Sequence, residues 1–388
     1  MSLRVLPAES RRDRERFIDL PWLLRRGDPD AWKNWIPPLR TQVRDLLDDG
    51  ENPFYRNASR RLFVAWRDGV PVGRIAAIEN REHNRFHRDR VGFFGFFDCA
   101  PDPEAATALL DAARGWLIAR GLDRIRGPMN PSTNHDCGVL VRGFRHPPTF
   151  LTPWNPRGYG ELLEEAGLEP TQDLLAYWIP VSDPRFQLPP RFEAQALRAR
   201  ERQGMSFRDV DLRRWEKELD LCWEIYNEAW EPNWGFVPLT REEFEYTAGD
   251  MKSLIYPEFA FIAEVEGEAA GFMLILPDLN HILKGIPDGR LFPTGLLRIL
   301  LGRRKLRSGR VIALGVKERY RSRSIFPLFA HEAFRRGQAM GALGAEASWI
   351  LEDNDSINRP LRAMGLRPHR RWRIFEGPLE PGGAGEAA

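Results

Sequence analysis

Two short stretches of the chain decide how its fold is read: DGVPVG at residues 68–73 and EGEAAG at residues 266–271. Their glycines share one interval, because Gly69 and Gly73 recur 198 residues later as Gly267 and Gly271. Each stretch has the composition of a tight turn between two strands, since glycine tolerates the positive φ that such turns require. A fixed interval of this length predicts an internal repeat.

The same interval returns outside these turns. Residues 166–170 (AGLEP) match residues 364–368 (MGLRP), and Pro180 matches Pro378. So many matches at one offset indicate two similar halves rather than a chance identity. We therefore place a first domain at 1–180, a linker at 181–205, a second domain at 206–378 and a flexible tail at 379–388.

The composition is that of a globular protein. The 388 residues are enough for two domains of ordinary size, and 43% are hydrophobic. Basic residues number 57 and acidic residues 55, so any nucleic-acid footprint would have to be local, and we expect no nucleic-acid partner. Three cysteines without a CxxC pair favour neither a disulfide scaffold nor a zinc site. We expect a cytoplasmic protein that needs no metal.

Both halves have the same predicted order of elements and the same α/β fold class. Each should form a mixed, mostly antiparallel sheet flanked by helices. In the first half we expect strands at about 61–67, 71–79, 91–98, 122–128 and 173–180, and helices at about 103–120 and 156–166. In the second half we expect strands at about 259–266, 269–276, 310–316, 344–351 and 370–376, and helices at about 322–340 and 355–364.

Residues 311–329 (VIALGVKERYRSRSIFPLF) join a strand to an amphipathic helix through a basic turn. The unpaired N–H groups and the dipole at a helix N-terminus favour an anion such as a pyrophosphate. The spacing V-x-x-x-Y-R, from Val316 to Arg321, resembles the acyl-CoA signature of the GNAT acyltransferase superfamily. In that family R-x-x-G-x-G is usual, whereas Ser324 and Phe326 replace the two glycines here. The resemblance implies an acyl-CoA site made by Val316, Arg319, Arg321, Ser322, Arg323 and Ser324; the alternative is an exposed basic helix start.

The matching stretch of the first half is residues 93–110, FFGFFDCAPDPEAATALL. Its helix begins with Asp102, Pro103 and Glu104, which offer no positive charge to a phosphate. We therefore expect a first GNAT-like domain without a pyrophosphate cradle. One acyl-donor site per chain follows, in the second half.

Three further segments extend the resemblance over nearly the whole chain. GPMNPSTN at 127–134, NWGFVP at 233–238 and WILEDN at 349–354 are similar to a bacterial group of tandem GNAT proteins, some of which look like bacterial ceramide synthases. The resemblance implies direct transfer of an acyl group from acyl-CoA to a primary amine, and in its sharper form to a long-chain, sphingoid-like amine. Two other functions stay open: a non-catalytic GNAT-fold protein that binds an acyl chain or a partner, and an aminoacyl-tRNA-dependent transferase.

Acyl transfer to an amine needs a group that takes up a proton. In the predicted strand AEASWILEDN, alternation puts Glu346, Ser348, Ile350 and Glu352 on one side. Glu352 is the first candidate for the base, because we expect it to lie half-buried at the open end of the strand. Glu346 is the second candidate. The alternative is that both glutamates only pair with arginines.

Other residues are candidates for contacts with the two substrates. Asn354 and Asn358 hold a pantetheine amide or the acceptor in this interpretation, or they serve only to begin the next helix. Trp230, Trp234 and Phe236 suggest an apolar acceptor pocket, or a small core beneath a long loop.

The segment 281–310 combines leucines with a formal charge of +7. An apolar run bracketed by cations is typical of a helix lying in an anionic membrane interface. This predicts peripheral membrane contact, which would suit a lipid acceptor. The alternative is that the leucines pack on the protein and only the basic end is solvated. The oligomeric state is not indicated by the sequence.

Overall fold

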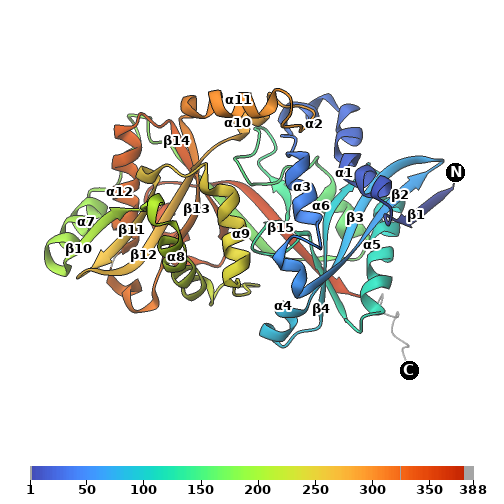
Figure 1. The fold of residues 1–388 in the computed structure, drawn as a ribbon, viewed down its shortest axis with the longest axis horizontal. Coiled ribbons are helices and arrows are strands. Elements are labelled where there is room, and N and C mark those ends of the chain that lie inside the picture. The colour runs from blue at the N-terminus through green and yellow to red at the C-terminus, as the bar shows by residue number, and fades with distance from the viewer. Residues whose placement is uncertain (1, 324, 380–388) are drawn as a thin grey trace. The chain divides into compact units, whose positions relative to one another are not determined.

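The computed structural model describes residues 2–323 and 325–379. They form two compact units, neither of which is one continuous stretch of sequence (Figure 1). Among the described residues, the first unit contains 2–174, 282–300 and 370–379. The second unit contains 175–281 and 301–369, apart from residue 324.

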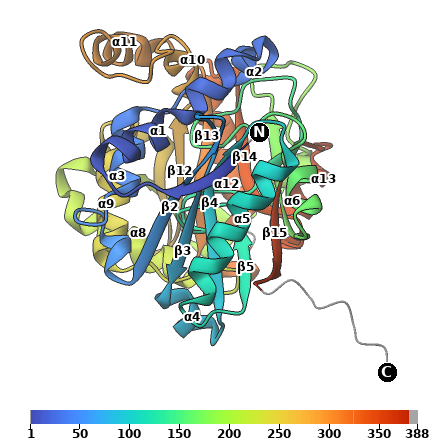
Figure 2. The ribbon, with the colours of Figure 1, turned by 90° about the vertical axis from the view of Figure 1, so that its right-hand side faces the viewer.

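The first unit is built on a sheet with the strand order β1-β2-β3-β4-β5-β15. Neighbouring strands are antiparallel except for β4 and β5, which run parallel. Helix α5 covers one face of this sheet, and its Leu109, Leu110 and Ala113 are fully buried there (Figure 2). The elements are β1 (Leu3–Pro7), α1 (Arg11–Arg26), α2 (Pro29–Asn34), α3 (Arg40–Leu47), β2 (Ala58–Arg67), β3 (Val70–Asn80), α4 (Arg81–His87), β4 (Val91–Cys99), α5 (Pro103–Ile118), β5 (Arg124–Gly127), β6 (Met129–Asn130), β7 (Asp136–Cys137), β8 (Val139–Arg142) and α6 (Tyr159–Glu165).

The second unit has the strand order β9-β14-β13-β12-β11-β10. Strands β10 to β13 are antiparallel to their neighbours, and β13 runs parallel to β14. The remaining elements are β9 (Glu169–Ile179), α7 (Pro190–Gln203), β10 (Met205–Asp209), α8 (Trp215–Trp230), α9 (Arg241–Lys252), β11 (Ala260–Val265), β12 (Glu268–Pro277), α10 (Asn280–Leu283), α11 (Gly295–Gly302), β13 (Ser308–Val316), α12 (Ile325–Ala339), β14 (Gly344–Leu351), α13 (Asp355–Ala363) and β15 (Pro368–Pro378).

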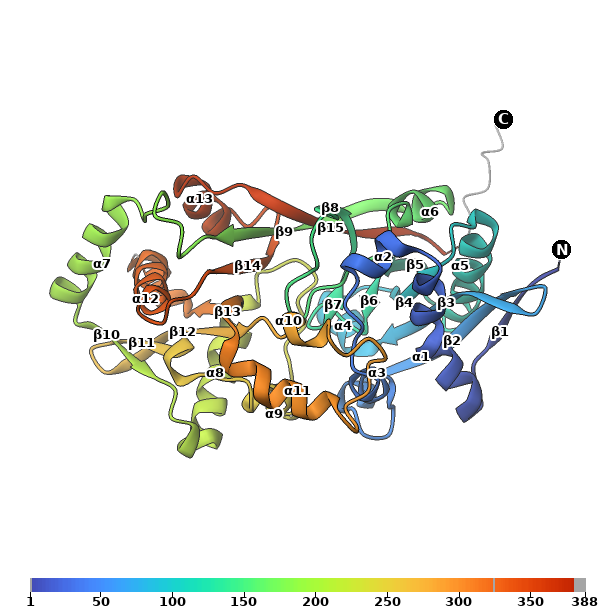
Figure 3. The ribbon, with the colours of Figure 1, turned by 90° about the horizontal axis from the view of Figure 1, so that it is seen from above.

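Two cores lie on opposite faces of the second sheet. In β12, Met273 belongs to the core that contains Phe329 of α12, whereas the adjacent Phe272 belongs to the core that contains Ile225 of α8. Successive residues of a strand point to opposite faces, so α12 and α8 cover different sides of the sheet. Helix α7 lies beside α12 (Figure 3).

The backbone confirms the internal repeat. Gly69 and Gly267 have φ angles of 82° and 84°, in hairpin turns that join β2 to β3 and β11 to β12. The residues before them, Asp68 and Glu266, also have positive φ, at 49° and 53°. Two successive positive φ angles are the pattern of a type I′ turn, which matches the twist of the flanking strands. The two halves therefore share the same turn at the same place in the fold.

The closing strands of the two halves do not stay with their own half. Strand β15, which ends the second half of the sequence, belongs mainly to the first unit, where Phe375 pairs with Gly127 of β5. Strand β9, which ends the first half, continues into the second unit from Leu175. The linker predicted at 181–205 contains α7, whose Phe192 and Ala196 are buried. The sequence bounds 1–180 and 206–378 follow chain order and stay a prediction.

His83 should make the stability of the protein sensitive to acid. Its ring is 2% exposed and lies 4.8 Å from the ring of Phe93, and burial, together with the charges of His87 and Arg126, lowers its pKa to about 3. The carboxylate of Asp89 is 3.8 Å from its Nε2. The histidine of the unfolded chain binds a proton more readily than buried His83 does. The contribution of neutral His83 to stability is therefore complete above pH 6.5 and is lost as the pH falls towards 3.

We therefore expect His83 to cost about 2 kcal/mol of stability between pH 7.5 and pH 5. The variant His83→Phe should lose that part of the pH dependence, measured as the midpoint of urea unfolding at the two pH values. His146→Phe, at an exposed position, is the control and should keep the wild-type dependence. Equal pH dependence in wild type and His83→Phe would show that His83 does not carry the effect.

Candidate functional site

The central feature of the second unit is a parting of two parallel strands. β13 and β14 pair from Ser308 to Val311 and from Gly344 to Ala347. Beyond this register β13 continues to Val316 and β14 to Leu351, and both continuations line a cavity of about 1090 Å³. The cavity is thus built into the sheet itself.

The cavity reaches both faces of the sheet and lies within the second unit. Phe326, Ala330 and Ala333 line it from α12, and Trp230 and Trp234 line it from the end of α8 and the segment that follows. Its wall is largely apolar, with polar groups at the turn after β13, at Ser348 and at residues 303–308. This is the composition of a site for a mostly apolar ligand with a few polar contacts.

The basic turn after β13 lies at one end of the cavity. Val316 and Arg321 line it, and the guanidinium of Arg321 donates to the carbonyl oxygens of Glu228 (3.2 Å) and Ala229 (3.3 Å). Arg319 instead pairs with Glu268 at 2.8 Å and is not among the lining residues. The side chains of Ser322 and Arg323 are not described, and Ser324 lies outside the described residues.

Two further groups define this turn. Phe326, which replaces a glycine of the family pattern, lines the cavity and packs against the core of β9 and α13. The carboxylate of Glu228 accepts a hydrogen bond from the backbone N–H of Glu318 at 2.7 Å. One backbone N–H of the turn is therefore already bound by a carboxylate of the protein.

The predicted acceptor residues divide into two sets. Trp230 and Trp234 line the cavity, and the Trp230 ring stacks on Tyr226 with centroids 4.5 Å apart. Phe236 is 3% exposed and lies 5.8 Å from Tyr226, beneath the surface that the two tryptophans form. Trp230 and Trp234 therefore lie at a cavity, whereas Phe236 belongs to a small core. The contact of the tryptophans with an acceptor stays a prediction.

The two candidate bases differ in burial. Glu346 is 0% exposed, as alternation along β14 predicts, whereas Glu352 follows the last residue of β14 in a turn and is exposed. The expected half-burial of Glu352 is therefore wrong, because the strand ends at Leu351 and the chain turns outward before the next helix. Leu351 and Asp353 line the cavity, but Glu352 does not.

Glu346 belongs to a buried polar network that reaches the cavity through Ser348. The Ser348 hydroxyl donates to Glu346 at 2.9 Å and accepts from Nε of Arg310 at 3.0 Å. Nε2 of His369 lies 2.9 Å from the second carboxylate oxygen, and the Arg310 guanidinium lies over the ring of Trp349. Alternation along the strand predicts Ser348 on the same side as Glu346. The participation of Arg310 and His369 could not be predicted, because they come from β13 and β15 and carry no local signal.

The two asparagines have different surroundings. Asn354 lines the cavity, and its side-chain oxygen accepts from Ser356 at 2.6 Å. Asn358 is 0% exposed, accepts from the Tyr177 hydroxyl at 2.9 Å and donates to the carbonyl oxygens of Leu351 and Glu352. Asn358 thus holds the turn between β14 and α13 together.

Comparison with known proteins places the chain in a family. No protein-family model matches it. The chain is 33% identical to Protein YghO of Escherichia coli over 374 residues, covering 95% of this chain and 93% of the relative. It is also 33% identical to a bacterial ceramide synthase of Caulobacter vibrioides over 384 residues, covering 97% and 98%. The chain belongs to the family of these two proteins.

Solved structures agree on the fold. A tandem GNAT protein from the clavulanic acid biosynthesis pathway matches with a TM-score of 0.53 at 12% identity, covering 98% of this chain and 100% of that one. A GCN5-related N-acetyltransferase from Sphaerobacter thermophilus matches with a TM-score of 0.55 at 15% identity, covering 98% and 96%. The fold is that of tandem GNAT proteins, and with the family it makes this protein an N-acyltransferase.

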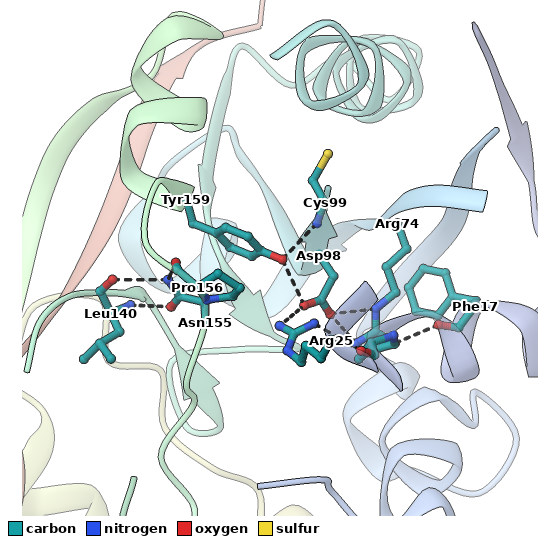
Figure 4. A network of polar contacts seen from close by, with 10 residues as sticks. Phe17, Arg25, Arg74, Asp98, Cys99, Leu140, Asn155, Pro156 and Tyr159 are labelled. Atoms are coloured by element: carbon teal, nitrogen blue, oxygen red, sulfur yellow. Dashed lines mark hydrogen bonds and ion pairs between the residues drawn. The ribbon is translucent and has the colours of Figure 1, made fainter. Parts of the chain in front are cut away.

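The first GNAT-like unit carries a buried polar network near the end of β4 (Figure 4). There, too, β4 and β5 pair only from Val91 to Phe93 and from Arg124 to Arg126. Asp98, near the end of β4, binds the guanidinium groups of Arg25 at 2.5 Å and Arg74 at 2.7 Å. These residues are buried, and beyond the parallel pair the backbone N–H of Phe96 in β4 donates to the side-chain oxygen of Asn130 at 2.5 Å, so β6 lies beside β4 there.

Further contacts complete this network (Figure 4). The hydroxyl of Tyr159 accepts from the backbone N–H of Cys99 at 3.1 Å and donates to Asp98 at 3.4 Å. Burial alone would raise the pKa of Asp98, but the charges and hydrogen bonds of Arg25 and Arg74 outweigh it and hold the pKa below the usual value. Asp98 is therefore ionised and fixed between two cations.

The first residues of the segment 282–300 pack within the first unit, and its last residues are exposed. Nζ of Lys284 donates to the carbonyl oxygens of Trp32 and Trp35, while α11 presents Leu297 and Leu301 with exposed fractions of 57% and 66%. The alternative in which these leucines pack on the protein is therefore wrong. None of the helices in the described ranges combines the length and the apolar composition needed to cross a bilayer.

The Asp98 network should be a large contributor to stability. Asp98→Asn keeps the size of the side chain but leaves two buried guanidinium groups without their counter-ion, and removing one partner from such a buried cluster costs about 3–5 kcal/mol. Chemical unfolding of the variant measures this loss.

Asp123→Asn is the matched control, because Asp123 pairs with Arg90 and both side chains are more than half exposed. An exposed pair of this kind contributes less than about 1 kcal/mol. Similar losses in the two variants would contradict the importance of the buried network.

Proposed function

We propose that this protein transfers an acyl group from acyl-CoA to the primary amine of a long-chain, sphingoid-like base, giving an N-acyl lipid. The observation that carries the proposal is the apolar cavity that opens where β13 and β14 part, between a basic turn and two tryptophans. The family membership supports it, because one relative is named a bacterial ceramide synthase.

The chemistry is a direct displacement. The neutral amine attacks the thioester carbonyl carbon, a C–N bond forms, the C–S bond breaks, and the thiol of CoA leaves. The amine must lose a proton, so a proton-accepting group has to lie beside the cavity. No covalent intermediate with the protein is required.

In this proposal the proton passes through Ser348 to Glu346. Ser348 lines the cavity, and its hydroxyl already donates to the Glu346 carboxylate at 2.9 Å. Ser348 takes a proton from the amine and gives its own proton to the Glu346 carboxylate. Arg310, which donates to Ser348, and His369, which lies beside Glu346, hold this buried network in place. Glu352 remains the competing candidate and lies in the exposed turn at the mouth of the splay.

The donor's phosphates lie at the basic turn in this proposal. Arg321 faces the cavity there, and we keep the neighbouring Arg319, Ser322, Arg323 and Ser324 as candidates from the sequence. Asn354 lines the same end of the cavity and is available to a pantetheine amide, whereas Asn358 has its amide hydrogens engaged within the protein. Trp230 and Trp234 receive the apolar acceptor.

The experiment that tests this function measures release of CoA thiol from a long-chain acyl-CoA in the presence of a long-chain primary amine. We expect turnover by the wild type and formation of an amide of the combined mass. In Glu346→Gln we expect kcat to fall by about 100-fold with little change in KM for acyl-CoA, because general base catalysis typically contributes factors of this order.

Glu352→Gln, directly after the end of the same strand, is the matched control and should keep most of the activity. The reverse result, with Glu352→Gln inactive and Glu346→Gln active, would assign the base to Glu352. A wild type that binds acyl-CoA but releases no thiol would favour the non-catalytic alternative. Salt-sensitive binding of tRNA, with acyl transfer only from aminoacyl-tRNA, would favour the third function.

We also propose that α11 and the basic residues after it bind an anionic membrane, at the cytoplasmic face where a lipid amine is available. Leu297, Leu300 and Leu301 are exposed, and Arg303, Arg304 and Lys305 follow directly. Apolar burial and attraction to anionic lipid then add.

Leu297→Glu/Leu301→Glu should lower co-sedimentation with phosphatidylglycerol vesicles at least tenfold, because it removes apolar area and adds negative charge. Turnover with a water-soluble short-chain amine should be unaffected. Leu6→Glu/Leu23→Glu, at two other exposed leucines, is the control. Equal vesicle binding by all three proteins would contradict the membrane contact.

A further inference from the structure

Helix α12 has two apolar faces: one is buried in the core over β11 and β12, and the other lines the cavity, where Phe326 and Ala330 also contact the core of β9 and α13. Leu328 and Phe329 are 0% exposed and belong to the core over β11 and β12. A second stripe, with spacings of four, three, four and three residues, lies on a different side of the helix and lines the cavity. It consists of Phe326, Ala330, Ala333, Gly337 and Met340.

The second stripe and the wall opposite it are made of small residues. Ala333 and Gly337 on α12 line the cavity together with Ala345 and Ala347 of β14. Leucine-sized side chains would fill such a space, as the leucines of α5 do in the first unit. Small residues on two facing elements leave a channel that follows α12 for about 20 Å.

The channel is narrow at Gly337. A Cβ added there would lie 3.3 Å from Cγ1 of Val181, which also lines the cavity. Even one methyl group at this position is therefore a tight fit. Beyond it the cavity continues to Met340, which is 51% exposed, and to the basic residues 303–307.

The position of the channel indicates which substrate it holds. It begins at the parting of β13 and β14, on the α12 face of the sheet, and the basic turn proposed for the donor's phosphates leads directly into α12. Trp230, in contrast, packs in the core on the α8 face. A thioester held by that turn therefore has its carbonyl at the splay and its hydrocarbon tail along α12, while the acceptor approaches from the tryptophans.

We propose that this channel takes the acyl chain of a long-chain thioester and that Ala333 and Gly337 set the longest chain accepted. This proposal rests on the function proposed above. In an apolar channel the affinity for the thioester increases with the length of its acyl chain, because each buried methylene raises affinity roughly fourfold. An acetyl group would leave almost the whole channel without a ligand.

The test is the kcat/KM of the full chain for acetyl-, octanoyl- and palmitoyl-CoA with one fixed long-chain amine. The wild type should prefer palmitoyl-CoA. Ala333→Phe should lower the palmitoyl-to-acetyl ratio of kcat/KM by at least tenfold. Gly337→Val should lower kcat/KM less for octanoyl-CoA than for palmitoyl-CoA, because residue 337 lies further along the channel than residue 333. Ala339→Phe, at an exposed position of the same helix, is the matched control and should keep the wild-type ratio.

Each other outcome has a defined meaning. If Ala333→Phe lowers kcat/KM equally for all three thioesters, or shifts the preference for acceptor length instead, the channel does not hold the acyl chain. If the wild type consumes no thioester, the proposed function fails. The channel is then judged by calorimetry with palmitoyl-CoA, whose affinity Ala333→Phe should lower and Ala339→Phe should not; equal affinities would overturn it.

Discussion

The second unit depends on one geometric constraint, which is that two parallel strands pair only at their beginning. β13 and β14 share register from Ser308 and Gly344 and then part. Backbone groups freed in this way, and the side chains beside them, face a space that the protein does not fill. The polar network of Arg310, Ser348 and Glu346 lies near the end of that pairing, where the strands begin to separate.

The two halves solve the same constraint differently. Both contain a parallel pair that parts after a few residues, and both have the same hairpin turn earlier in the sheet. In the first unit the freed backbone of β4 is covered by other parts of the same unit, because Asn130 accepts from the backbone N–H of Phe96 and the Tyr159 hydroxyl accepts from that of Cys99. In the second unit the corresponding place remains open to a ligand.

The sequence predicted most of the fold because its signals are local. The glycine turns at Gly69 and Gly267, the alternation in β14 and the cap at Asp102 each act within a few residues. The strands and helices expected from the sequence are present within a few residues of their predicted ends. The buried position of Glu346 followed from the same alternation.

What the sequence could not predict depends on contacts between distant segments. His369 meets Glu346 only because β15 passes beside the second sheet, and the small-residue stripe of α12 becomes a channel only because Ala345 and Ala347 face it. Glu352 was expected to be half-buried because its strand was extended by one residue, and a shift of that size moves a side chain from the sheet into a solvated turn.

The exchange of closing strands has a consequence for how the chain reaches its folded state. Unit one receives its strand β15 from a segment that follows the strands of unit two in the sequence, so its sheet ends at β5 until that segment has been made. An unpaired edge of this kind invites other chains to add to it. The sheet of unit one is consequently completed only after unit two has been made, and a nascent chain stalled before residue 368 would expose an unpaired β5 edge.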